Sequence, residues 1–142
     1  MYERILLAYD GSVEGRAALK EGALLARQDK AQVFLLSVVA TSGALMAAES
    51  NHAGPLAGAL DQYNAILESG MARLVEAGIP VTGKVVVGEP AQCIAAYARE
   101  IGADLVVVGH RRKSLVERWW SGASGAYLVD HLGCSLLIAR NP

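Results

Sequence analysis

The chain has 142 residues, the length of one domain, and we expect a single domain over residues 1–142. Its 13 Lys and Arg residues against 14 Asp and Glu give a net charge of −1, which argues against a dedicated nucleic-acid binder. Hydrophobic residues make up 53% of the chain, which excludes intrinsic disorder, yet no uncharged apolar run approaches the roughly 20 residues of a membrane-spanning helix. The start of the chain lacks the apolar stretch of a signal peptide, so we expect a cytoplasmic protein without membrane insertion.

Short apolar runs, several rich in β-branched residues, predict strands that are buried on both faces, as in parallel sheets. They lie at residues 5–9, 33–36, 85–87, 105–108 and 136–138. Helical spacing of apolar residues predicts helices at 13–28, 60–77, 90–101 and 122–132. The Ala-, Ser- and Gly-rich stretch 41–60 is predicted to be a loop.

The first predicted helix has Ser12 as its expected N-cap. Its apolar residues Ala17, Ala18, Leu24 and Leu25 are expected on one side, with charged residues largely on the other. Alternation of strands and helices indicates βαβ units, and therefore an α/β fold: a doubly wound parallel sheet with helices on both faces.

Ligands of such sheets bind beyond the carboxyl ends of the strands. We expect residues 10–12, 37–41 and the segment from Gly109 onward to converge there. The segment 109–125 carries a local charge of +3, which leaves −4 for the remainder of the chain. Its glycine and the amides of the following helix N-terminus suit a phosphate, whereas a solvated basic loop capped by Ser121 explains the same residues. Spacing alone leaves both interpretations open.

No residue is predicted to be catalytic. The chain has no G-x-S-x-G elbow, no P-loop and no G-x-G-x-x-G motif. The three histidines lack metal-ligand spacing, so no metal site is expected, although His110 adjoins Gly109 and could touch a phosphate. Cys93 and Cys134 are interpreted as structural.

Over almost its full length the chain resembles the universal stress protein family, also called the UspA family. The resemblance rests on ILLAYDGS at 5–12, VGEP at 87–90, ADLVVVG at 103–109 and HLGCSLLIAR at 131–140. It implies a Rossmann-like fold of five strands in the order 3-2-1-4-5. It also implies a stress-response homodimer joined through its last strand, 135–140. Because no residue pair resembles a base poised beside a nucleophile, we expect at most slow ATP hydrolysis.

Family members that bind ATP carry a glycine, two residues, a second glycine, nine residues, a third glycine and then Ser or Thr. Here the corresponding residues are Gly109, Arg112, Gly122 and Ala123, so two of the four positions depart from the pattern. The Arg112 side chain either blocks the site or grips a phosphate itself. Loss of a hydroxyl at Ala123 removes one contact, about 0.5–1.5 kcal/mol, which Ser121 or Ser124 would replace if either faces the ligand.

The resemblance implies that Asp10 lies near adenine and ribose and that the backbone around Val38 and Val39 lines the adenine pocket. The expected ligand is ATP or AMP, with or without Mg²⁺. The residues expected to bind it are Ala8, Asp10, Ser12, Val38, Val39, Gly109, His110, Arg112, Gly122, Ala123 and Ser124. Residues 10–12 also suit a turn and helix cap, and the two roles use different atoms.

A second hypothesis is a nucleotide-free interaction dimer with a degenerate ATP motif. It would act through its dimer surface and the region of Trp119 and Trp120, whose rings either pack on the sheet or form a partner surface. An adenylate-forming enzyme is a third hypothesis, disfavoured because residues 10–14 are not a Ser- and Gly-rich phosphate loop.

Overall fold

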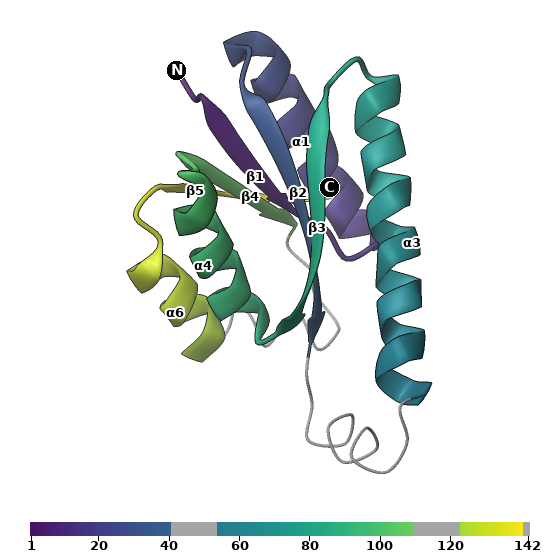
Figure 1. Cartoon of the computed structure of the whole chain (residues 1–142). Coiled ribbons are helices and arrows are strands. Elements are labelled where there is room, and N and C mark those ends of the chain that lie inside the picture. Colours follow the sequence, from purple (N-terminus) through teal and green to yellow (C-terminus); the bar gives the residue numbers. More distant parts are fainter. Residues whose placement is uncertain (41–53, 110–122, 141–142) are drawn as a thin grey trace.

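The computed structural model describes residues 1–40, 54–109 and 123–140. These residues form a five-stranded parallel sheet in the order β3-β2-β1-β4-β5, flanked by helices (Figure 1). The predicted doubly wound sheet and its strand order are therefore confirmed. The elements are β1 (Arg4–Ala8), α1 (Val13–Asp29), β2 (Gln32–Ala40), α3 (Gly54–Glu76), β3 (Val81–Gly88), α4 (Pro90–Ile101), β4 (Leu105–Gly109), α6 (Ala123–His131) and β5 (Ser135–Ala139).

Three predicted boundaries are wrong. Strand β2 extends to Ala40, so residues 37–40 belong to the strand and do not follow it. Strand β3 begins at Val81 rather than at residue 85, because it is an edge strand in which exposed Thr82 and Lys84 alternate with half-buried residues. Helix α3 begins at Gly54, so the predicted loop 41–60 does not extend beyond residue 53. Pro55 is the second residue of this helix, a position where its missing N–H costs no hydrogen bond.

Helix α1 begins as predicted, with the Ser12 side-chain oxygen accepting a hydrogen bond from the Gly15 amide at 2.9 Å. It ends at Lys30, which adopts a left-handed conformation with φ 56°. The expected orientation of Leu24 is wrong: this side chain is 53% exposed, whereas Ala18 is buried. Leu24 therefore belongs to the outer surface of the helix.

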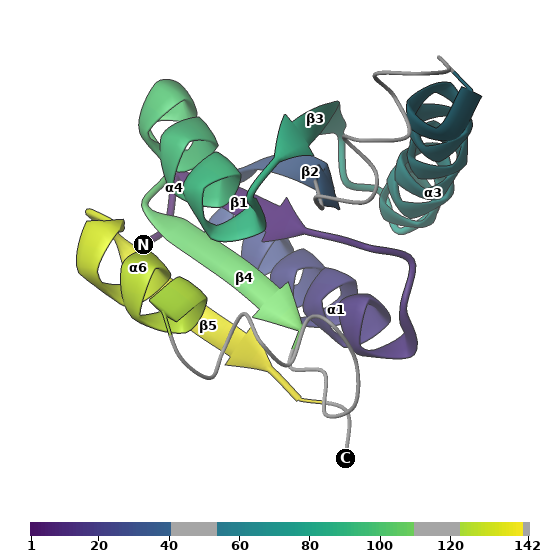
Figure 2. The same ribbon diagram turned by 90° about the horizontal axis from the view of Figure 1, so that it is seen from below.

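The side chains of β1 alternate between two apolar cores. Ile5 and Leu7 face α1 and α3, whereas Leu6 faces α4 and α6, and all three are fully buried. Figure 2 shows the two helix pairs on opposite faces of the sheet. The continuous apolar runs of the sequence thus come from a sheet covered on both faces.

The ring of Tyr9 lies between the two helices of one face. A Cβ atom on Gly15 of α1 would lie 2.8 Å from Tyr9 Cδ1, and one on Gly70 of α3 would lie 2.8 Å from Tyr9 Cδ2. Neither helix position has room for a side chain, and Tyr9 is only 5% exposed. Contact with this one ring limits how closely both helices approach the sheet.

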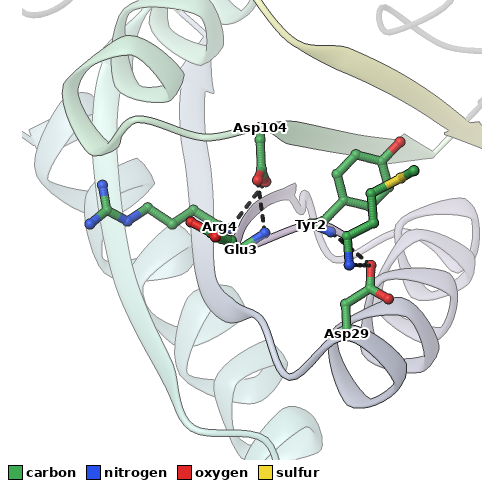
Figure 3. Close-up of polar contacts among 6 residues, drawn as sticks. Tyr2, Glu3, Arg4, Asp29 and Asp104 are labelled. Atoms are coloured by element: carbon green, nitrogen blue, oxygen red, sulfur yellow. Dashed lines mark hydrogen bonds and ion pairs between the residues drawn. The ribbon is translucent and has the colours of Figure 1, made fainter.

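The amino end of the sheet, where the parallel strands begin, is held by two aspartates (Figure 3). The Asp104 carboxylate accepts hydrogen bonds from the amides of Glu3, at 2.7 Å, and Arg4, at 3.0 Å. The Asp29 carboxylate accepts one from the Tyr2 amide at 2.9 Å. These bonds fasten the start of β1 to β4 and to the end of α1.

Candidate functional site

The carboxyl end of the sheet brings the ends of β1, β2 and β4 together. Strand β1 pairs with β2 up to Ala8, opposite Leu36, and β2 continues beyond this point to Ala40. Strand β4 likewise continues past Val107, its last residue paired with β1, to Gly109. The central strand β1 thus ends before its two neighbours, and the order of connections reverses around it, as at the ligand site of doubly wound sheets.

Asp10 and Ser12 form a turn that leads from β1 into α1. Asp10 Oδ1 accepts hydrogen bonds from the Ser12 amide, at 3.0 Å, and from the Ser12 hydroxyl. The same hydroxyl oxygen accepts from the Gly15 amide, and Gly11 between them has a φ of 83°. The interpretation as a turn and helix cap is therefore confirmed, while a nucleotide contact of Asp10 stays a prediction.

The end of β2 is more deeply buried than the sequence suggests. Val38 is 8% exposed and Val39 only 2%, so any contact of these residues with a ligand is confined to a small surface. Sequence reasoning missed Ser37, a fully buried residue whose hydroxyl donates to the Tyr9 carbonyl oxygen at 2.8 Å. The sequence signal for this hydrogen bond was the single hydroxyl residue within the apolar run VFLLSVV.

Gly109 has a packing role that the sequence did not reveal. A Cβ atom at this position would lie 2.3 Å from the carbonyl oxygen of Glu14 and 2.6 Å from its carbonyl carbon. Both are backbone atoms in the first turn of α1. The glycine therefore allows the first turn of α1, which follows the Asp10–Ser12 turn, to pack against the end of β4.

The remaining predicted site residues are described in part or not at all. His110, Arg112 and Gly122 lie outside the described residues, as do Trp119 and Trp120. Ala123 and Ser124 are the first two residues of α6, one residue later than the predicted helix start. Because α6 connects two parallel strands, its N-terminus points to the same end of the sheet as Asp10 (Figure 1).

The two cysteines are half-buried in the part of the chain that the structure describes. Burial raises the pKa of the Cys93 thiol, and the negative charge of Glu89 adds to the increase. Burial likewise raises the pKa of Cys134, together with the charge of Asp104. Both side chains therefore stay protonated at neutral pH and are poor nucleophiles.

Residues 1–40, 54–109 and 123–140 contain no group of three or more His, Cys, Asp and Glu side chains that could hold a metal ion. None of the helices described is long and apolar enough to cross a membrane.

Comparison with known proteins identifies relatives over the whole chain. A sequence model of the Universal stress protein family, Usp, matches residues 1–140. Universal stress protein Sll1388 from Synechocystis is 24% identical over 152 residues, an alignment that spans 99% of each chain.

Solved structures share the fold. Hypothetical protein MJ0577 matches with a TM-score of 0.82 and 21% identity, over 100% of this chain and 98% of that one. A universal stress protein family protein from Arabidopsis thaliana with AMP bound matches with a TM-score of 0.66 and 17% identity. The match covers 99% of this chain and 92% of that one. A universal stress protein from Archaeoglobus fulgidus in complex with dAMP matches with a TM-score of 0.71 and 16% identity. The match covers 97% of this chain and 98% of that one.

Proposed function

The chain belongs to the universal stress protein family, and we propose on that premise that it binds an adenine nucleotide, ATP or AMP, at the carboxyl end of its sheet. The site comprises the Asp10–Ser12 turn, the ends of β2 and β4, the N-terminus of α6 and the basic segment after Gly109. The protein acts in the cytoplasm as a non-catalytic nucleotide sensor in the stress response.

The observation that carries this proposal is that helices α1 and α6 both begin at the carboxyl end of the sheet. Helix α1 begins beside Gly109, and α6 begins on the same side. Unsatisfied amides and the positive end of the helix dipole attract a phosphate. The AMP and dAMP complexes of structurally similar proteins support adenine as the base.

We also propose that β5 forms a homodimer interface. This strand is last in the sheet order, and its Ile138 side chain is 40% exposed. An unpaired apolar edge strand needs a partner or a cover. Sedimentation velocity of I138D, with V129D on the exposed face of α6 as control, is expected to show monomers for I138D alone.

Calorimetric titration with ATP and with AMP tests nucleotide binding. We expect saturable heat below millimolar concentration, and about 2- to 10-fold tighter binding by A123S, which restores the hydroxyl of the family motif. The control R99G removes an exposed cation at the other end of the sheet and is expected to leave the affinity unchanged. No heat up to millimolar nucleotide, in the parent chain and in A123S, would favour the nucleotide-free interaction dimer instead.

A further inference from the structure

A groove of about 250 Å³ runs between α1 and α3 on the outer surface of the molecule. Both helices cover the same face of the sheet (Figures 1 and 2). The groove is distinct from the proposed nucleotide site. Its lining consists of Arg16, Leu19, Lys20, Ala23, Leu24, Arg27, Arg73, Leu74 and Ala77.

The charge of this lining has one sign. Four of the lining residues are cationic and none is a carboxylate, since Glu21 and Glu76 of the same helices lie outside it. Among the residues that the structure describes, Arg16, Lys20 and Arg73 form no ion pair within 4.0 Å. Within the described part of the chain the groove is thus a cluster of four cations, on a chain with a net charge of −1.

The floor of the groove is apolar. Leu19 and Leu74 are buried beneath it, at 4% and 2% exposure, while Leu24 stands beside them with 53% of its surface exposed. The α1 residues of the lining recur at helical spacing between Arg16 and Arg27, a stripe about 16 Å long. Arg27 closes one end, where its guanidinium donates to the Ala77 carbonyl oxygen at 2.6 Å.

The volume and length of the groove indicate which kind of ligand can bind in it. Pockets for small ligands measure about 300–1,000 Å³, so this groove has room for a few inserted side chains rather than for a whole ligand. A stripe of about 16 Å matches three turns of helix. A second copy using the same groove would place cations against cations, because a two-fold contact pairs identical surfaces.

We propose that the α1–α3 groove docks an acidic amphipathic helix of a partner protein. Apolar side chains of that helix pack on exposed Leu24 and on Ala23 above the buried floor, and its flanking Asp and Glu side chains pair with Arg16, Lys20 and Arg73. Helix-in-groove recognition of this kind uses apolar anchors at i, i+3, i+4 and i+7, with charges fixing orientation and partner choice.

The probe for this proposal is a synthetic peptide of about 14 residues, with leucines at i, i+3, i+4 and i+7 and glutamates on both sides of that stripe. It is titrated into the ¹⁵N-labelled full chain and followed by amide chemical shifts. We expect saturable shifts concentrated at residues 16–27 and 73–77. The double variant K20E/R73E is expected to bind at least about tenfold more weakly, a loss of about 1.4 kcal/mol.

Matched controls distinguish specific binding in the α1–α3 groove from nonspecific electrostatic attraction of the peptide. R99E reverses an exposed cation on α4, on the other face of the sheet, and is expected to retain binding within about twofold. L24A should weaken binding, whereas V75A, which truncates an exposed valine outside the lining, should not. A scrambled peptide of the same composition should bind about tenfold more weakly because it lacks an apolar stripe.

Several outcomes would overturn the proposal: equal binding of the scrambled peptide, shifts centred elsewhere, or unchanged affinity of K20E/R73E. Groove-dependent binding of anionic phospholipid vesicles without binding of the peptide would assign the groove to a lipid surface instead. Dimers of the parent chain that K20E/R73E alters would assign it to a second copy.

Discussion

The two ends of the sheet use similar residues in different ways. At the amino end, Asp104 and Asp29 accept hydrogen bonds from the amides of residues 2–4. These bonds hold the start of β1 in place. At the carboxyl end, Asp10 and Ser12 form the turn that opens α1, next to the proposed site for a ligand.

The helices explain this difference. Each helix after a strand begins at the carboxyl end and finishes at the amino end, so the positive ends of the helix dipoles gather at the former. At the amino end, Arg4 donates to the Ile101 carbonyl at 3.1 Å and Arg27 to the Ala77 carbonyl, which satisfies the C-termini of α4 and α3. The helix dipoles therefore favour an anion at the carboxyl end, whereas arginine side chains satisfy helix carbonyl groups at the amino end.

The largest expected effect concerns Gly109. In G109A the new methyl group meets the backbone of Glu14, which cannot move without displacing the first turn of α1. We expect a loss of about 3 kcal/mol in the free energy of unfolding, measured by urea denaturation without nucleotide. The control G58A adds a methyl group in open space on α3 and should stabilise the protein by about 0.5–1 kcal/mol. Unchanged stability of G109A would mean that this glycine serves the ligand alone.

A smaller effect is expected at the amino end from D104A, which removes the acceptor of the Glu3 and Arg4 amides at the start of β1. Water can reach both groups, so we expect a loss of about 2 kcal/mol in the free energy of unfolding. The control D130A, at an exposed position of α6, should change the free energy of unfolding by less than about 0.5 kcal/mol. Nucleotide affinity of D104A should equal that of the parent chain. A large change in affinity would contradict the division of roles between the two ends.

The smallest effect is a pH dependence. The hydrogen bond from the Tyr2 amide lowers the pKa of Asp29 below its ordinary value of 3.8, with a further contribution from the amino group of Met1. Because the folded-state pKa is the lower one, this carboxylate stabilises the fold above 3.8 and loses that contribution as the pH falls through the folded-state pKa.

Urea denaturation of the parent chain and D29N across this range measures the effect. The parent chain should be the more stable at neutral pH, and the difference should shrink below pH 3.8. D130N makes the same change of charge on α6, and its stability relative to the parent chain should not depend on pH in this way. A difference between parent and D29N that is constant with pH would show that Asp29 acts without its charge.

The sheet was predictable because its strands are buried on both faces and leave uninterrupted apolar runs. The start of β3 was not, since exposed Thr82 and Lys84 interrupt the apolar pattern of this edge strand, and Lys84 pairs with Glu100 of α4. Helical spacing also assigned Leu24 to the inner face, but the groove between α1 and α3 leaves it exposed. In both cases the sequence indicated the helix or strand. The exposure of the individual side chains depended on which other elements pack against that helix or strand in the folded protein.

The candidate site was predictable to the extent that it depends on strand ends. Asp10 and Ser12 form one turn, and Gly109 packs against Glu14 and Gly15 in the helix that follows this turn, because the carboxyl ends of parallel strands lie at one edge of the sheet. A ligand contact of these residues stays a prediction. The function of Asp104 was not predictable, because it depends on β4 starting beside β1, and that register is a property of the folded sheet. The backbone contact of Gly109 with Glu14 has the same origin.

The contact of Tyr9 with Gly15 and Gly70 has a consequence for how this sequence can evolve. A side chain at either glycine collides with the ring, and a smaller residue in place of Tyr9 alone leaves a cavity between α1 and α3. Each single step is therefore unfavourable, while a paired exchange, with a smaller residue at 9 and alanine at 15 or 70, keeps the volume filled. We expect these three positions to covary among relatives, and the width of the α1–α3 groove to change with them.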